Sequence, residues 1–215
     1  MAHDHTDETH HAHIHHDPDQ PQEVDEAQLR VRALETILVE KGYVDPATLD
    51  SIIDYFEHRV GPHVGAKAVA RAWVDESFKR ALLEDGAAAI QTLNLVPRIG
   101  DHLIVVENTP MQHNMVVCTL CSCYPWDVLG LPPTWYKSAA YRSRAIIDPR
   151  GVLTDFGVAL PESTEIRVWD STAETRFLVL PMRPANTESL GEDALAALVT
   201  RNSMIGTAVP VGPSA

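Results

Sequence analysis

The chain has 215 residues, of which 45% are hydrophobic and 22% charged, an ordinary composition for a soluble globular protein. Its formal net charge is −13, and residues 1–26 contribute eight acidic side chains and no Lys or Arg. A mildly acidic body with an acidic tail argues against nucleic acid or an anionic membrane as partner, because both require a basic face. No apolar run approaches the roughly 18 residues of a membrane span, and the polar N-terminus lacks the apolar core of a secretory signal. The expected location is therefore the cytoplasm.

Residues 1–22 are expected to form a disordered tail. The stretch contains seven His, has two prolines near its end and shows neither helical nor strand periodicity. Its imidazoles could bind divalent metal loosely, but a solvated tail is the simpler interpretation.

Residues 23–95 are expected to form a helical arm that contacts a second subunit. Apolar residues at helical spacing predict a helix over 23–42, and Asp45 followed by Pro46 predicts the start of a second helix. Two more helical stretches are expected at about 63–74 and 75–84, the latter ending before Gly86.

Residues 96–215 have a mixed pattern. Strands are expected at 103–106, 115–117, 166–169 and 176–180, and helices between Pro132 and Arg144, around 148–156 and at 192–201. The predicted fold class is α+β, with an N-terminal helical arm followed by a layered α/β metal-binding domain.

The three cysteines of the chain all lie between positions 118 and 123. An odd number of thiols within six residues cannot form the disulfide framework of a secreted domain. Clustered thiols of this kind indicate a metal site or redox chemistry.

The spacing Cys121-Ser122-Cys123 suits a planar claw on one metal ion. The two sulfurs and the amide nitrogens of Ser122 and Cys123 would close chelate rings of five or six members. Cys118, three residues earlier, can add an axial sulfur and leave the sixth octahedral position open. A backbone amide binds metal well only after losing its proton, which favours a trivalent cobalt or iron ion over tetrahedral zinc.

Two other metal sites compete with the claw. C-x-x-C also occurs in zinc and redox sites, and a zinc site would need a fourth ligand, for which His113 is the nearest His. An iron–sulfur cluster would usually need a fourth Cys, which the chain lacks.

The residues around the cysteines resemble the signature of nitrile hydratase α subunits. The resemblance covers the segment from Val117 to Trp126, the segment from Val128 to Ser138 and the run Tyr141-Arg142-Ser143-Arg144, and it extends over roughly residues 27–207. It implies the α-chain fold of that family.

The resemblance implies a role for each residue of the claw. Cys118, Cys121 and Cys123 would be sulfur ligands, and the amides of Ser122 and Cys123 would be nitrogen ligands. Cys121 would mature to a sulfinate and Cys123 to a sulfenate, and Cys118 would stay a thiolate.

The resemblance also indicates the metal. In iron-type members a Ser usually follows the first Cys and a Thr the last, whereas here Thr119 and Tyr124 take these places, as in the cobalt type. Cobalt(III), one ion per αβ pair, is therefore expected, with iron(III) as the alternative. One residue departs from the family pattern: Asp127 stands where Pro is usual, and its expected effect is confined to the surface or to a local turn.

The activity implied by the resemblance is hydration of a nitrile to its amide. The sulfenate oxygen of Cys123 would act as nucleophile or as base for water, and both possibilities stay open. Asp170 and Glu174 match acidic residues that support the metal centre without binding the metal. The alternative interpretation of these two acids is a polar hairpin between strands.

Partners and rival functions follow from the same likeness. A nitrile hydratase β subunit is expected, in an αβ or α2β2 assembly, because arginines of that subunit hold the oxidised sulfurs and this chain shows no obvious basic set. A separate metallochaperone or activator is expected to load the metal. The alternatives are the metal subunit of thiocyanate hydrolase, which shares the cysteine motif, and a non-enzymatic cobalt-binding protein, which the His-rich tail suggests.

Overall fold

The computed structural model describes residues 26–55, 60–96, 99–100, 102–121 and 123–213. The chain divides into two compact units, Met1–Leu49 and Asp50–Ala215. The tail predicted over residues 1–22 lies outside the described residues. Among the described helices, none has the length and apolar character needed to cross a membrane.

The first unit contains α1 (Glu26–Glu40), and α2 (Pro46–Asp54) runs across the division. Asp45 precedes α2, and its carboxylate accepts hydrogen bonds from the amide of Ala47 (3.1 Å) and the hydroxyl of Thr48 (3.0 Å). This is the cap that the Asp45-Pro46 pair predicts. The helix α1 exposes four large apolar side chains: Leu29, Val31, Leu34 and Ile37.

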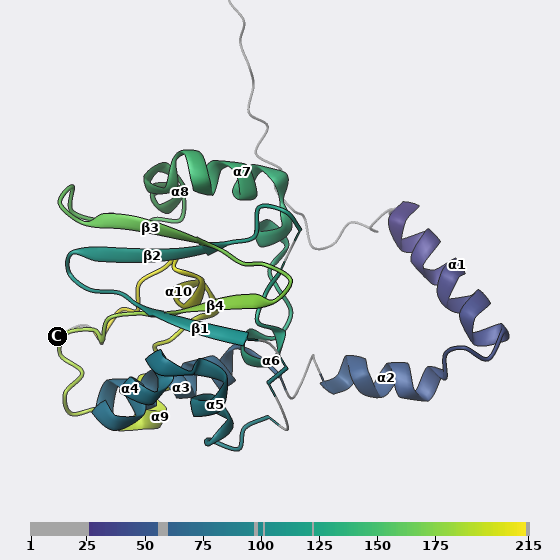
Figure 1. The fold of residues 1–215 in the computed structure, drawn as a ribbon, viewed down its shortest axis with the longest axis horizontal. Coiled ribbons are helices and arrows are strands. Elements are labelled where there is room, and N and C mark those ends of the chain that lie inside the picture. Colours follow the sequence, from purple (N-terminus) through teal and green to yellow (C-terminus); the bar gives the residue numbers. More distant parts are fainter. Residues whose placement is uncertain (1–25, 56–59, 97–98, 101, 122, 214–215) are drawn as a thin grey trace, which may run out of the picture. The chain divides into compact units, whose positions relative to one another are not determined.

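The second unit is built on four strands that form two parallel pairs. They are β1 (His102–Glu107), β2 (Gln112–Val117), β3 (Glu165–Asp170) and β4 (Thr175–Leu180). The strand β1 pairs with β4 and β2 pairs with β3, and the two pairs lie side by side in the order β3, β2, β4, β1 (Figure 1). The four expected strands are therefore present, each within a few residues of its predicted bounds.

Helices cover both pairs of strands. The helices α3 (Pro62–Val74), α4 (Glu76–Glu84) and α5 (Gly86–Gln91) lie beside β1, and α7 (Ala139–Ile147) and α8 (Pro149–Asp155) lie beside β3 (Figure 1). The predicted stop at Gly86 is half right: α4 ends there, but α5 begins at once. Asp85 caps α5 by accepting the amide of Ala88 (2.9 Å). A Cβ on Gly86 would lie 2.7 Å from the carbonyl oxygen of Leu103, so this glycine permits close packing on β1.

The remaining helical segments are short. They are α6 (Trp126–Leu129), the 3₁₀ turn η2 (Thr134–Lys137), α9 (Glu192–Ala196) and α10 (Arg201–Ile205). The single helix predicted over 192–201 is wrong, because Thr200 and Ser203 form a capping box that starts a separate helix. The helix α10 contacts both β2 and β4.

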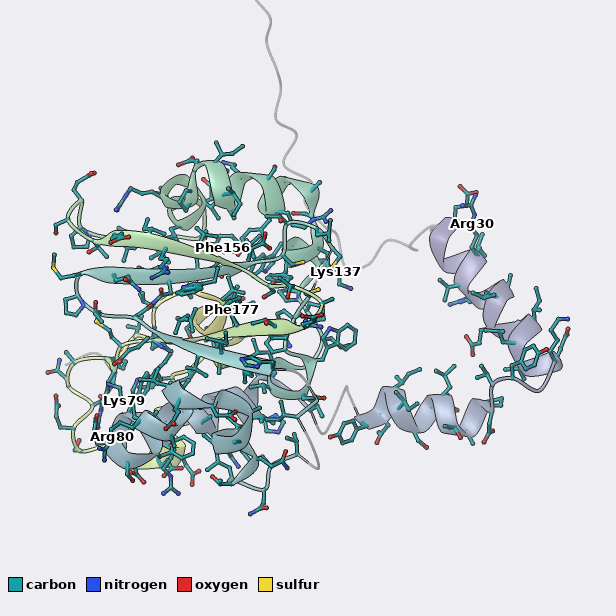
Figure 2. All side chains as sticks on the ribbon, viewed as in Figure 1. Arg30, Lys79, Arg80, Lys137, Phe156 and Phe177 are labelled. Atoms are coloured by element: carbon teal, nitrogen blue, oxygen red, sulfur yellow. The ribbon has the colours of Figure 1, made fainter. Side chains whose placement is uncertain are left out.

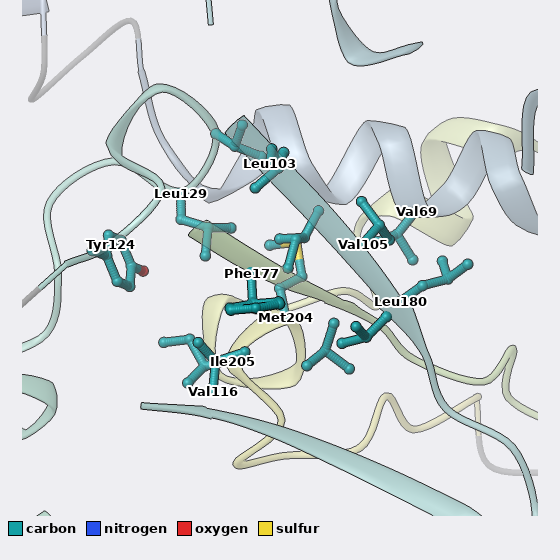
Figure 3. Close-up of a cluster of buried hydrophobic side chains, with 14 of the residues drawn as sticks. Val69, Leu103, Val105, Val116, Tyr124, Leu129, Phe177, Leu180, Met204 and Ile205 are labelled. Carbon is teal, nitrogen blue, oxygen red and sulfur yellow. The ribbon is translucent and has the colours of Figure 1, made fainter. Parts of the chain in front are cut away.

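The apolar core fills the space between the strands and these helices. Phe177 of β4, Leu129 of α6 and Met204 of α10 converge in it, and Tyr124 lies at its edge (Figure 3). Phe177 also stacks on Trp169 of β3 with ring centroids 5.1 Å apart, which joins the two pairs of strands (Figure 2). This arrangement of helices on short parallel sheets confirms the α+β prediction.

Candidate metal centre

The cysteine loop, residues 118–123, begins where β2 ends. Parallel pairing places Val117, the last residue of β2, opposite Asp170, the last residue of β3. The amide of Ser171 continues the pairing by donating to the carbonyl of Val117 (2.7 Å). Because parallel strands end at the same edge of a sheet, the cysteine loop and the Asp170–Thr175 link start side by side.

The structure gathers the three cysteine sulfurs in one place. The Sγ atoms of Cys118 and Cys121 are 3.4 Å apart, those of Cys121 and Cys123 are 3.1 Å apart, and all three lie within 4.8 Å of one another. The amide of Cys121 donates to the sulfur of Cys118 (3.3 Å). In the described part of the chain, this is the one group of three or more His, Cys, Asp or Glu side chains close enough to share an ion.

These distances distinguish between coordination geometries. Sulfurs bound to one ion at about 2.3 Å lie roughly 3.3 Å apart at a right angle and roughly 3.8 Å apart at a tetrahedral angle. The printed pairs of 3.1 and 3.4 Å match the right angle, which octahedral coordination requires. The donor set thus fits a six-coordinate ion. Ser122, whose amide is one of the expected ligands, lies outside the described residues.

The three sulfurs differ in their environment. Cys118 is buried, Cys121 is exposed, and Cys123 is intermediate between them. Burial, followed by the neighbouring thiols of Cys121 and Cys118, raises the pKa of Cys123 to about 12, and the positive charge of Arg176 acts in the opposite direction. Without a metal, the Cys123 thiol is therefore neutral at pH 7.

Asp170 fixes the start of the cysteine loop. Its carboxylate accepts a hydrogen bond from the amide of Thr119 (2.9 Å) and a second from the Thr119 hydroxyl (2.5 Å). Asp170 therefore holds the residue between two of the cysteines, and Thr119 supplies the hydroxyl for this contact.

Glu174 lies in the same link but is placed differently. Its side chain is exposed, and its carboxylate makes no hydrogen bond or ion pair with other described residues. The hairpin interpretation of the link is wrong, since β3 and β4 belong to different sheets and do not pair. The link instead carries the chain from the end of one parallel pair to the start of the other.

Two arginines and a tyrosine hold the loop from its other sides. Arg142 of α7 donates from Nη1 to the carbonyls of Cys121 (3.1 Å) and Leu120 (3.3 Å). The hydroxyl of Tyr136 donates to the carbonyl of Cys123 (2.9 Å), and Nε of Arg176 donates to the carbonyl of Tyr124 (3.3 Å). The sequence analysis expected no basic set near the cysteines in this chain. The signal was present in Tyr141-Arg142-Ser143-Arg144, but helical spacing alone does not show which arginine faces the loop.

His113 is engaged elsewhere and does not join the cysteines. One ring nitrogen, Nε2, bonds the carbonyl of Gly206 (2.7 Å), and the other, Nδ1, lies 3.3 Å from the side-chain amide of Asn108. Burial lowers the pKa of His113 below its usual range, so the ring is neutral, donates to Gly206 and accepts from Asn108. With both nitrogens occupied, His113 cannot serve as the fourth ligand of a tetrahedral zinc site.

Asp127 bonds a neighbouring loop. Its Oδ2 accepts the amide of Gly100 at 3.0 Å. The side chain is thus half-buried in the first turn of α6 and joins that turn to the segment before β1.

Comparison with known proteins relates these features to one family. A family model described as the nitrile hydratase alpha chain matches residues 25–208. The α subunit of the low-molecular-weight cobalt-containing nitrile hydratase of Rhodococcus rhodochrous is 54% identical over 194 residues, covering 90% of this chain and 94% of that subunit. The thiocyanate hydrolase γ subunit of Thiobacillus thioparus is 38% identical over 200 residues, covering 88% of this chain and 82% of that subunit.

Solved structures agree with this pattern. A double mutant of the Fe-type nitrile hydratase of Comamonas testosteroni superposes with a TM-score of 0.82 at 43% sequence identity, covering 88% of this chain and 93% of the other. The resemblance stated from the cysteine motif and its flanks is therefore confirmed over most of the chain.

Proposed function

Because this chain belongs to the nitrile hydratase α-chain family, we propose that it is the metal-binding subunit of a cobalt nitrile hydratase, an enzyme that hydrates a nitrile to its amide. The observation that carries this proposal is the group of three sulfurs within 4.8 Å of one another, two pairs of which have right-angle spacing. The 54% identity to a subunit named as cobalt-containing supports the choice of metal.

The proposed ligands are the sulfurs of Cys118, Cys121 and Cys123 and the amide nitrogens of Ser122 and Cys123. Cobalt(III) bound there would supply Lewis acidity to a nitrile or water in the open sixth position. Thr119 and Tyr124 favour cobalt over iron, as they match the cobalt-type pattern.

Oxidation of two of the cysteines completes the proposed centre. Dioxygen would convert Cys121 to a sulfinate and Cys123 to a sulfenate, because metal-bound thiolates are electron-rich. The Cys123 sulfenate oxygen would attack the substrate or take a proton from an attacking water. Cys118 is buried, which favours its remaining a thiolate.

Asp170 and Glu174 would act on the ligand loop rather than on the metal. The two hydrogen bonds from Thr119 to Asp170 support this role for Asp170 directly. For Glu174 the support is its match to the family position and its exposed carboxylate, which is available to a group outside this chain.

A β subunit is the proposed partner, in an αβ or α2β2 assembly, and an activator would load the cobalt. We assign the helical arm, residues 23–95, to contact with that subunit. The exposed apolar side chains Leu29, Val31, Leu34 and Ile37 on α1 support this assignment, since a row of such residues in water favours association.

One experiment tests this function against its rivals. The chain would be produced together with its β subunit in ample cobalt, and the purified complex would be assayed on a nitrile and on thiocyanate and analysed for metal. We expect amide formation, little thiocyanate hydrolysis and about one cobalt per subunit pair, since one six-position ligand set holds one ion. Thiocyanate turnover without nitrile turnover would favour the thiocyanate hydrolase alternative. Cobalt binding without either activity would favour a non-enzymatic protein, and stoichiometric iron or zinc would contradict the cobalt assignment.

A further inference from the structure

Arg142 is fixed in place by the helix that carries it. The preceding residue, Tyr141, is buried and donates its hydroxyl to the carbonyl of Val116 on β2 (2.7 Å). Ser138 caps the same helix by accepting the amide of Tyr141 (3.1 Å). The strand that leads into the cysteine loop and the helix that bears Arg142 are therefore joined directly, and this sets the position of the guanidinium.

The guanidinium of Arg142 faces the loop rather than water alone. Nη1 bonds the carbonyls of Cys121 and Leu120 at 3.1 and 3.3 Å. Nε is buried and has no hydrogen-bond partner among the residues that the structure describes. An arginine present only for solubility would keep Nε in water, because a buried unpaired N–H is costly.

The carbonyl of Cys121 has a particular chemical significance. It belongs to the same peptide group as the nitrogen of Ser122, one of the two proposed amide ligands. When that nitrogen binds a trivalent ion, its proton passes to water and the peptide group becomes an anion whose charge is shared with the carbonyl oxygen. A cation that donates to this oxygen stabilises the anion through a charge-assisted hydrogen bond.

The whole ligand set needs such compensation. Three thiolates and two deprotonated amides carry more negative charge than one trivalent ion neutralises, and Coulomb interactions are strong in a partly desolvated loop. Asp170 holds the loop at Thr119 but adds a further negative charge. Arg142 is the cation that bonds a peptide group containing a proposed ligand.

We propose that Arg142 is a positioning residue for metal capture. It holds the carbonyls of Leu120 and Cys121 before the ion arrives, and it offsets the negative charge of the Cys121–Ser122 peptide group when the Ser122 nitrogen coordinates. This role rests on the proposed function for the identity of the ligands, and it adds a determinant of metal loading that lies outside the ligand set.

The test compares substitutions at Arg142 with a matched control on the same helix. Arg144 is exposed and forms ion pairs with Asp148 and Asp155, away from the cysteine loop. Wild type, Arg142→Gln, Arg142→Lys and Arg144→Gln would each be produced with the β subunit over a series of cobalt concentrations. Cobalt content and the sulfur-to-cobalt charge-transfer absorption would be measured, with circular dichroism as the check on folding.

We expect Arg142→Gln to need roughly 10–100-fold more cobalt in the medium for half occupancy, the usual scale for losing an outer partner of a metal ligand. Its absorption band should shift, because the charge beside a coordinated amide changes. Arg142→Lys keeps a cation and should load within a few-fold of wild type, and Arg144→Gln should match wild type.

Wild-type loading and an unshifted band in Arg142→Gln would overturn the proposal. If Arg142→Gln does not accumulate, Arg142→Lys decides alone: loading close to wild type supports the role of the charge, and a loss as large as tenfold overturns it. Nitrile turnover of fully loaded wild-type complex tests the proposed function separately, so the two failures are distinguishable.

Discussion

At the residue scale, the three cysteines have the same chemistry but different surroundings. Cys118 is buried against the end of β2, whereas Cys121 is exposed and Cys123 is intermediate. Oxidation requires thiolate character and access, so the two accessible sulfurs should oxidise and the buried one should not. Mass spectrometry of the peptide spanning residues 118–123 should find two added oxygens on Cys121. One more should be found on Cys123 where the sulfenate survives handling.

Replacing one sulfur tests the role of its oxygen. Cys123→Ser should abolish nitrile hydration even in protein that retains some cobalt, because the hydroxyl cannot form a sulfenate. Cobalt content and turnover are the measurements. An active wild-type enzyme whose three cysteines are all unoxidised thiols would refute the sulfenate role and leave the metal site standing.

Glu174 offers a second test at this scale. Glu174→Gln should keep most of the cobalt and lower turnover by about 10–100-fold, since an amide of similar shape cannot present the same charge to the groups around the centre. Steady-state turnover per bound cobalt is the measurement. Glu162→Gln is a matched control, because Glu162 is also an exposed acid but lies in the loop before β3. Equal turnover in both variants would assign Glu174 to an ordinary exposed link.

At the scale of elements, the junction of α10 with β2 depends on one glycine. Gly206 ends α10 with φ of 91°, and a Cβ there would overlap the carbonyl of Asn114 and lie 2.9 Å from Cα of Met115. Gly206→Ala should therefore combine a left-handed backbone with a backbone clash. We expect a loss of about 3–5 kcal/mol in the free energy of unfolding, at the high end for a single substitution.

Gly157 separates these two contributions. It also has a positive φ, of 77°, but a Cβ there would meet nothing within 4 Å. Gly157→Ala should cost only about 1–2 kcal/mol, the cost of the left-handed conformation alone. Denaturant unfolding of both variants provides the comparison, and equal losses would show that α10 moves away from β2 without penalty.

At the scale of the whole molecule, the His-rich tail should be separable from catalysis. Deleting residues 1–22 should leave the turnover of fully loaded enzyme nearly unchanged, because a polar segment without periodicity has no apolar face to pack. Cobalt loading could still slow when the metal is scarce, since the tail holds seven His. Turnover per bound cobalt is the measurement, and a large loss at full occupancy would assign the tail to the active structure.

Local patterns predicted most of the elements of this fold, but not their ends. Apolar periodicity and the Asp45-Pro46 pair predicted α1 to α4 and the four strands, because local propensity and burial agree there. The start of α5 and the break before α10 were missed, since both depend on caps, at Asp85 and Thr200, that compete with continuation of a helix. The short α6 has too few residues for a periodic signal.

The sequence by itself determined the family and the candidate ligands. Cys118, Cys121 and Cys123 are so close along the chain that chelate geometry follows from covalent structure, and the flanking residues carry the family resemblance. The tertiary structure decided what surrounds them. The parallel pairing of β2 with β3 brings Asp170 to Thr119 across 51 positions, and α7 brings Arg142 to the carbonyls of Leu120 and Cys121. Such contacts depend on strand register and helix packing, which are set by the buried core of the whole domain rather than by neighbouring residues.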